Sequence, residues 1–446
     1  MPPLIALLLC TVFVVALLWL EHKQSLALSG ALWIPTIWFL SCGTKGLGNW
    51  LMIGSDIESG SPLDRAFLII LFCLGLIILH RRKFDWSTAA KEYSWLLVLM
   101  SFMTLSLLWS DMPWISFRRW MREVVAVVIA FIVSSESNPR LSLKSILRRA
   151  IYILIPFSII LIKYFPQYGR EYNRWTGETT WVGVSSQKNG LARICIISVL
   201  FLAWAVLTKR KKQEVPVSKY IEYIDIFMLL LSLYLLGGPY RTLRHSATSS
   251  ASLIGGLFLL ATLLLVKRRG KAIGHIAIMA LLTLTIIYGS ATPFLGKLEI
   301  FDVSSYFGRT ENLTGRANIW AILIPYAMRR PILGYGVGGF WTTAMREMTS
   351  AHAHNGYLEL ILHFGFVGLI IFSLFLLACC RRAIRTLAED FNWGVLFIVF
   401  LFMTVIYNIA EVSIYTFTSP LSSLIVLFFV TLKDTDIIKQ TPGHLS

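Results

Sequence analysis

The stretch LIALLLCTVFVVALLWL, residues 4–20, decides the fold class of this chain. It contains no charged residue and approaches the ~20 residues that an α-helix needs to cross a bilayer. It has no basic segment before it and no obvious small-residue cleavage site after it, so we expect a retained span rather than a signal peptide. Similar runs recur along all 446 residues, of which 56% are hydrophobic. The sequence therefore predicts an all-α, polytopic integral membrane protein with about twelve or thirteen transmembrane helices.

The apolar runs divide the chain into three parts. Residues 1–290 are expected to form an N-terminal transmembrane bundle, and residues 356–446 the C-terminal transmembrane helices with a tail. Between them, residues 291–355 form a large polar loop, in which residues 315–330 have the pattern of an amphipathic helix. A glycine-rich run at 334–339 must make tight backbone turns against another part of the protein.

Basic residues cluster in alternate short loops, and the net charge is +17. The clusters are Arg81-Arg82-Lys83, Arg148-Arg149, residues 209–212, residues 267–269 and Arg381-Arg382. Because short loops rich in Lys and Arg stay in the cytoplasm, these clusters predict a cytoplasmic C-terminus and an outward-facing loop 291–355. The six cysteines lie in or beside apolar runs, which argues against a disulfide framework or a thiolate zinc site.

The loops predicted to face outward are nevertheless basic. Their cations include Arg174, Lys188, Arg193, Arg241, Arg244, Arg309, Arg316 and Arg346. Arginine at an outer membrane boundary opposes the insertion rule and is costly, so it usually has a ligand. The guanidinium fork suits bidentate phosphate recognition. Lipid headgroups or solvated loops explain any single residue, but they explain the whole set less well, so we expect an anionic substrate at the outer face.

A histidine pair precedes the apolar run that begins at Gly356. His354 lies at the mouth of this span, and a histidine there can act as a general base near neutral pH, although it could equally be an ordinary interfacial or capping residue. With His352 and His363 it could hold a metal ion, but one His-x-His without carboxylate or cysteine partners is a weak signal.

Two acidic residues near membrane boundaries are further candidates. Glu359 stands one helical turn before His363, so the two could orient each other, contact the substrate or simply neutralise each other. Glu411 follows the apolar run that ends near residue 409. Charged groups at such depth are functional candidates by default.

Four motifs then occur in a fixed order. They are Trp-x-Gly-x-Ser-x-Gln-Lys-Asn-Gly at 181–190, Thr-Gly-Arg at 314–316, Pro-x-Leu-Gly-Tyr-Gly at 331–336, and His354-Asn355 with Gly365 and Gly368 downstream. Together they resemble the O-antigen ligase/polymerase superfamily, integral membrane glycosyltransferases of bacterial surface polysaccharide assembly, and within it the exopolysaccharide polymerases of the succinoglycan type. Two positions depart from the pattern: His245-Ser246-Ala247-Thr248 lacks the arginine of a Ser-Arg-Thr motif, and Gln187 replaces a frequent histidine.

The resemblance implies a multi-pass enzyme of the bacterial inner membrane with its active site facing the periplasm. It would polymerise undecaprenyl-pyrophosphate-linked oligosaccharide repeat units into exopolysaccharide or O-antigen. The alternatives are an O-antigen ligase of lipopolysaccharide biosynthesis, which transfers the polymer to lipid A-core, and, more distantly, a flippase for lipid-linked glycans. The expected partners are the lipid-linked glycan, membrane lipid, a chain-length regulator and export machinery, with no nucleic acid.

The resemblance also assigns roles to residues. His354 would be the general base, and Arg316 would stabilise the departing pyrophosphate without a metal or any other cofactor. The expected substrate-binding residues are Lys188, Arg174, Arg241, Arg244, Arg309, Asn355, Glu359 and Glu411.

Overall fold

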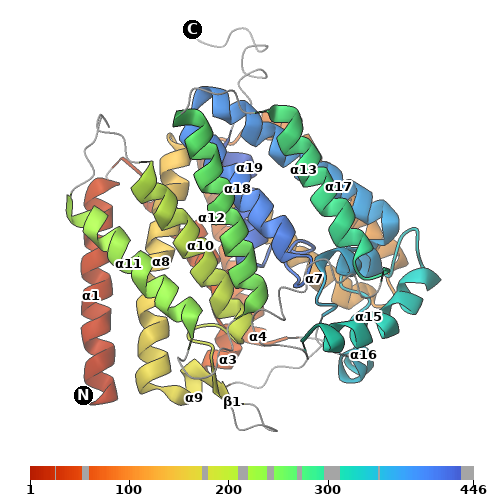
Figure 1. Ribbon diagram of the computed structural model, residues 1–446, viewed down its shortest axis with the longest axis horizontal. Helices are drawn as coiled ribbons and strands as arrows, with labels where there is room; N and C mark the ends of the chain where they lie inside the picture. The colour runs from red at the N-terminus through yellow and green to blue at the C-terminus, as the bar shows by residue number, and fades with distance from the viewer. Residues whose placement is uncertain are drawn as a thin grey trace.

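Long apolar helices make up most of the computed structural model (Figure 1). The structure describes residues 1–25, 27–52, 60–172, 179–208, 219–238, 246–268, 274–295, 312–349 and 352–432. The first elements are α1 (Pro3–Gln24), η1 (Gly30–Leu32), α2 (Trp33–Gly43), α3 (Leu47–Trp50), α4 (Pro62–Arg81), α5 (Trp86–Glu92), α6 (Ser94–Leu105), η2 (Ser106–Trp109), α7 (Pro113–Ser134), α8 (Pro139–Tyr164) and α9 (Pro166–Gly169). The later elements are β1 (Arg170–Tyr172), β2 (Thr179–Trp181), α10 (Lys188–Leu207), α11 (Lys219–Gly237), α12 (Ala247–Arg268), α13 (His275–Ala291), α15 (Asn312–Arg329), α16 (Thr343–Met348), α17 (Gly356–Glu389), α18 (Phe391–Tyr407) and α19 (Pro420–Thr431).

The described residues have the fold expected of an all-α polytopic membrane protein. Seven helices are long and apolar enough to cross a bilayer, namely α1, α4, α8, α10, α11, α12 and α17. The pair α5 and α6, bent by 94°, raises this number to eight if it forms one broken span. Four shorter apolar segments follow the same pattern: residues 30–43, α13, α18 and α19. The expected twelve or thirteen spans therefore require these short segments, and α7, to cross as well.

Helix ends follow local sequence signals. Ser61, Asp85, Asn138 and Asp390 each accept a hydrogen bond from a backbone N–H in the first turn of the helix that follows. Such caps satisfy donors that have no partner within the helix. The only strands in the described residues are β1 and β2, a short antiparallel pair in which Arg170 lies opposite Trp181.

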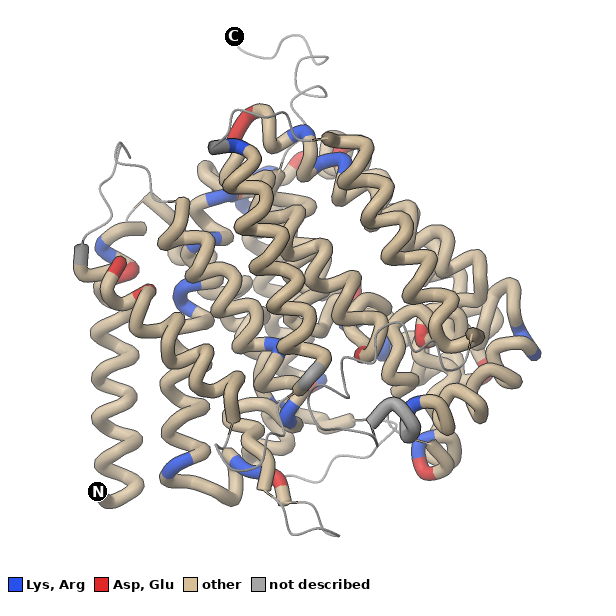
Figure 2. Tube along the Cα trace, viewed as in Figure 1, with Lys and Arg blue, Asp and Glu red and all other residues tan. Residues whose placement is uncertain are grey.

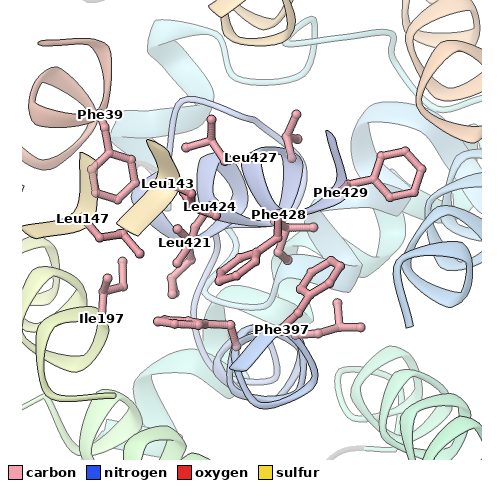
Figure 3. Close-up of a cluster of buried hydrophobic side chains, with 14 of the residues drawn as sticks. Phe39, Leu143, Leu147, Ile197, Phe397, Leu421, Leu424, Leu427, Phe428 and Phe429 are labelled. Carbon is pink, nitrogen blue, oxygen red and sulfur yellow. The ribbon is translucent and has the colours of Figure 1, made fainter. Parts of the chain in front are cut away.

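The short helices α18 and α19 form the centre of the bundle. Every residue of α19 is buried. Leu421 and Leu424 lie on the side of α2, α8 and α10, Phe428 lies against α18, and Phe429 points away from them toward Phe375 of α17 (Figure 3). Phe428 of α19 stacks on Phe397 of α18 with ring centroids 5.0 Å apart, a contact that contributes about 0.5–1.5 kcal/mol beyond area burial. A helix that is apolar on all sides needs protein or lipid around it, and α19 has protein.

Charged residues gather toward the two ends of the bundle and leave the middles of α1, α12 and α13 free of charge (Figure 2). At one end, Arg82 pairs with Glu136, Arg140 pairs with Glu389 at 3.2 Å, and Lys267 lies over the ring of Phe391. These contacts bring several loops of the basic clusters to the same end. The helices α15 and α16 lie together at the other end (lower right in Figure 1).

One basic cluster is not in a loop. The sequence analysis placed Arg148-Arg149 between spans, but both residues lie inside α8 and are buried. Arg148 pairs with Asp225 of α11 at 2.6 Å, and Arg149 pairs with Glu21 of α1 at 2.7 Å. The expectation was wrong because carboxylates on distant helices compensate these charges, which a loop would leave to solvent.

A break in α17 explains the glycine-rich run. Gly365 has φ of 64°, and an added Cβ there would overlap the carbonyl of Ile332. The backbone groups released by the break bond to the run instead: Phe366 N–H donates to Pro331 O at 2.7 Å, and Tyr335 N–H donates to Leu362 O at 2.9 Å. Residues 331–335 therefore complete the hydrogen bonding of a kinked helix at membrane depth, where unsatisfied backbone is costly.

Candidate active site

His354 immediately precedes Asn355, the residue that caps α17. Its backbone is left-handed, with φ of 53°, which is uncommon for a residue other than glycine and costs of order 1–3 kcal/mol. Its Nδ1 atom is buried, has no hydrogen-bond partner among the described residues, and lies 3.7 Å from Oε1 of Glu411. The side chain as a whole is 26% exposed. One edge of the ring is therefore enclosed, and the rest remains accessible.

Glu411 is the centre of the cluster. It lies between α18 and α19 and its side chain is only 4% exposed. Its Oε1 atom accepts from Asn189 Nδ2 of α10 at 2.7 Å and from Arg316 Nη2 of α15 at 2.9 Å. Burial would raise the pKa of this carboxyl, but His354 and the Arg316 guanidinium outweigh it and hold the pKa below its usual value. One ionised carboxylate thus joins α10, α15 and the segment before α17.

His352 completes the cluster. Its ring centroid lies 4.1 Å from that of His354, and His354 N–H donates to His352 Nδ1 at 3.3 Å. Burial, and then the neighbouring His354, lower the pKa of His352, so it is neutral at physiological pH.

The cluster also contains a possible set of metal ligands. His352, His354 and Glu411 offer ligand atoms that lie within 4.8 Å of one another. Two imidazoles and a carboxylate are ligands that zinc accepts. A cation there would have to compete with the guanidinium of Arg316 for Glu411. His363, the third histidine considered from the sequence, lies elsewhere and contacts Glu359.

Asn355 is fully buried and uses all of its hydrogen-bonding capacity on the protein. Its Oδ1 accepts from the N–H groups of Tyr357 and Leu358, and its Nδ2 donates to Gly289 O and Ile409 O. This side chain therefore ties the start of α17 to α13 and to the Glu411 segment. Asn355 thus lies beside the cluster, where it caps α17 and connects it to the neighbouring segments.

Glu359 is likewise fully buried, on the inner side of α17. Its carboxylate accepts from Trp341 Nε1, from Ala353 N–H at 2.8 Å, and lies 3.3 Å from His363 Nε2. Gly338 N–H donates to Nδ1 of the same His363 at 3.1 Å. Glu359 thus connects the glycine-rich run to the residue that precedes His354.

The Glu411 segment is held from two sides. The side chain of Asn408 accepts from Ser413 N–H at 2.7 Å and from Ile414 N–H at 3.1 Å. Glu123 of α7, which is buried, accepts from the Thr416 hydroxyl at 2.7 Å and from Phe417 N–H. These contacts fix the loop that presents Glu411 to His354.

The structure brings together only part of the site expected from the sequence. His354, Arg316 and Glu411 meet, Asn355 and Glu359 support them, and Lys188 begins α10 one residue before Asn189. Arg174, Arg241, Arg244 and Arg309 lie outside the described residues. Asn189 was not expected in the site, although it belongs to the Gln-Lys-Asn-Gly motif and its position there was a usable signal. His352 was considered from the sequence only as a possible metal ligand.

Comparisons with known proteins agree with these motifs. Residues 231–373 match the O-Antigen ligase family. The exopolysaccharide production protein ExoQ of Rhizobium meliloti (strain 1021) is 24% identical over 334 residues, which cover 71% of each chain. The two matches confirm the predicted superfamily. The segment matched to the O-antigen ligase family holds Arg316, the glycine-rich run and His354, whereas Asn189 and Glu411 lie outside it.

The position of the cluster is compatible with the similarity to the O-antigen ligase/polymerase superfamily. The names of the two matches, an O-antigen ligase family and an exopolysaccharide production protein, both refer to surface polysaccharides. In this chain, the cluster lies at the ends of helices, beside α15, rather than in the middle of the bundle. Such a place is within reach of both a lipid-borne group and a glycan in water.

Proposed function

We propose that the chain is a polysaccharide polymerase that joins oligosaccharide repeat units carried on undecaprenyl pyrophosphate. The observation that carries this proposal is the meeting of a partly exposed histidine, a buried carboxylate and an arginine at the end of a membrane bundle. We infer the lipid-linked substrate from the similarity to the superfamily. The similarity to ExoQ, an exopolysaccharide production protein, favours the polymerase over the ligase.

In the proposed reaction, a hydroxyl of the acceptor sugar attacks the anomeric carbon of the donor glycan. The bond from that carbon to the pyrophosphate oxygen breaks, and the lipid pyrophosphate leaves with the electron pair. His354 takes the hydroxyl proton. Its Nδ1 faces Glu411, so Nε2 is the nitrogen left to receive the proton, and the Glu411 carboxylate stabilises the imidazolium that forms.

The remaining residues have supporting roles in this proposal. Arg316 stands beside the leaving group, and Lys188, Arg174, Arg241, Arg244 and Arg309 are proposed to contact the lipid-linked substrate. Glu359 and Asn355 are proposed to position His354. Glu359 accepts from the N–H of Ala353, the residue before His354, and Asn355, the residue after it, is held by its bonds to Gly289 O and Ile409 O. No metal is assigned a step.

We further propose that the site faces the periplasm from the inner membrane and that the C-terminus is cytoplasmic. The clustering of basic loops at the end of the bundle opposite α15 and α16 supports this orientation. A chain-length regulator and export machinery are proposed partners of the growing polymer.

Deletion of the gene in its bacterium tests the function. Loss of a polymerase leaves single repeat units on the lipid carrier, whereas loss of a ligase leaves long polymers that are not attached to lipid A-core. Accumulation of repeat units confined to the inner leaflet would instead indicate a flippase. Mass spectrometry of lipid-extracted glycans separates single repeat units from long polymers, and labelling of spheroplasts with a membrane-impermeant glycan reagent shows which leaflet holds the repeat units. Only the first outcome agrees with the proposal.

A further inference from the structure

One arginine near the cluster has no counter-ion. Across the described residues, carboxylates pair with Arg82, Arg140, Arg148, Arg149, Arg316 and Arg330. Arg193 of α10 has no such partner in these residues. Its Nη1 atom donates to the hydroxyl of Ser419 at 3.3 Å, and its Nε atom is buried without a hydrogen-bond partner.

Arg193 lies close to the cluster formed by His352, His354 and Glu411. It stands one helical turn after Asn189, so the two side chains share one face of α10. Asn189 holds Glu411, and Ser419 ends the same loop that contains Glu411. The guanidinium of Arg193 is also among the charges that lower the pKa of His352, after burial and His354.

The surroundings of Arg193 are polar and contain small side chains. Ser185 is 5% exposed, and a Cβ on Gly190 would overlap its hydroxyl while lying 3.9 Å from Arg193 Nη2. Ser419 stands on the other side. Hydroxyl groups beside a guanidinium are the donors that phosphate oxygens accept from.

The charges around the cluster favour an anion at Arg193. Arg316 and Glu411 neutralise each other through the 2.9 Å contact, whereas Arg193 has no carboxylate partner among the described residues. A half-buried charge without a counter-ion at membrane depth is costly, and so is a buried donor without an acceptor. A bound anionic group removes both costs.

We propose that Arg193 binds the phosphate or pyrophosphate group of a lipid-borne substrate, with Ser419 and Ser185 as neighbouring donors. This site rests on the proposed function, in which a polyprenyl pyrophosphate is the donor. The two arginines then have different roles: Arg193 anchors the anion, whereas Arg316, beside the leaving group, also orients Glu411 and, through it, His354.

Binding of farnesyl pyrophosphate, a short polyprenyl pyrophosphate, tests the site. The purified full chain in nanodiscs of zwitterionic lipid is titrated by calorimetry. Arg193→Gln should raise the Kd by at least about tenfold, the loss expected for a charge-assisted hydrogen bond. Arg193→Lys, which keeps the charge but loses the fork, should lie between Arg193→Gln and the wild type. Arg330→Gln is the matched control, because Arg330 is exposed and pairs with Asp111, and it should bind like the wild type.

Ser419→Ala is a second variant of the same site, included in case Arg193→Gln loses binding only because it misfolds. Ser419 precedes α19 but makes no side-chain capping bond, so its loss should leave the helix intact and weaken binding by a smaller factor. Wild-type affinity in both Arg193→Gln and Ser419→Ala overturns the site, whereas loss in both supports it. If the wild type binds no farnesyl pyrophosphate at all, the proposed donor fails together with this site.

Two further ligands distinguish the source of the anion. A substrate site should prefer farnesyl pyrophosphate to inorganic pyrophosphate, because the lipid tail adds binding in the membrane. Phosphatidylglycerol in the nanodisc should not displace farnesyl pyrophosphate. Displacement by phosphatidylglycerol at equal mole fraction would show a general headgroup site and overturn the proposal.

Discussion

At the scale of the residue, His354 is the group on which the proposed chemistry depends most. His354→Ala and His354→Gln should insert and fold normally but lose transfer by about 10²–10⁴-fold, the usual contribution of a general base. The measurement is glycan transfer by purified protein from a lipid-linked donor. Turnover near that of the wild type in His354→Ala would remove the residue from the mechanism.

The stabilisation of the fold by Glu411 should depend on pH. Its pKa is lowered in the folded protein, so its ionised contacts with Arg316 and Asn189 stabilise the fold above its ordinary pKa of roughly 4.3. This stability should be lost as the pH falls through the lower, folded-state pKa. Thermal unfolding should therefore distinguish wild type from Glu411→Gln at neutral pH, and the difference should shrink in acid. A difference that is constant from neutral to acid pH would mean that the charge of Glu411 does not stabilise the fold.

The sequence predicted which residues belong to the site better than it predicted the contacts that their side chains make. The sequence predicted that His354 and Arg316 lie in one site, and both side chains lie next to Glu411. It did not show that Asn355 exhausts its hydrogen bonds as a cap, because a capping asparagine and a binding asparagine look alike in a sequence. Nor did it show that Glu411 reaches His354, because that contact depends on a loop fixed by Asn408 and Glu123.

At the scale of the element, the break in α17 is the feature most sensitive to substitution. Gly365→Ala would require a left-handed alanine and would overlap the backbone of Ile332 and Leu333. The strain alone costs of order 1–3 kcal/mol, and the overlap adds to it, so we expect a lower melting temperature and loss of transfer. Gly255→Ala in α12, whose nearest neighbour would be Ile406 at 3.6 Å, is the control and should be neutral or slightly stabilising. Equal behaviour of the two variants would show that the break is not needed.

The sequence predicted elements well where composition alone decides them, as in the apolar run at 4–20, which lies in α1, and the amphipathic pattern at 315–330, which lies almost wholly in α15. The apolar runs correspond to helices, and the glycine-rich run turns against α17 as expected. The kink, however, lies inside one apolar run, and only the glycine at its centre hinted at it. Arg148 and Arg149 show the opposite case, in which charges that suggested a loop are neutralised inside α8 by Asp225 and Glu21.

At the scale of the whole molecule, the proposal requires the cluster and the basic loops to lie on opposite sides of the membrane. A cysteine at exposed Ala344 of α16 should react with an impermeant maleimide in intact spheroplasts, whereas one at exposed Arg381 should react only after permeabilisation. Both variants are made in a cysteine-free background because the natural chain has six cysteines. The reverse labelling pattern would place the site in the cytoplasm and exclude a periplasmic polymerase.

The whole-molecule charge distribution also bears on the need for a metal. Glycosyl transfer to or from a pyrophosphate needs positive charge near the leaving group, which carboxylate-bound metal supplies in many soluble enzymes. Here Glu411 already bonds to Arg316 and Asn189, and Arg193 stands behind it as a further cation. Guanidinium groups in a partly dehydrated site can stabilise the developing charge themselves.

Transfer by the purified protein should therefore persist in excess EDTA. The measurement is the initial rate with lipid-linked donor and acceptor before and after chelation, with a metal-dependent glycosyltransferase as the positive control for chelation. Loss of activity that one particular divalent ion restores would contradict the prediction. The ligands would then be His352, His354 and Glu411, whose ligand atoms already lie within 4.8 Å of one another, and His352→Ala would have to lower the affinity for that ion. Without such an effect of His352→Ala, the restored activity would have to come from a metal bound elsewhere, for example to the pyrophosphate of the substrate itself.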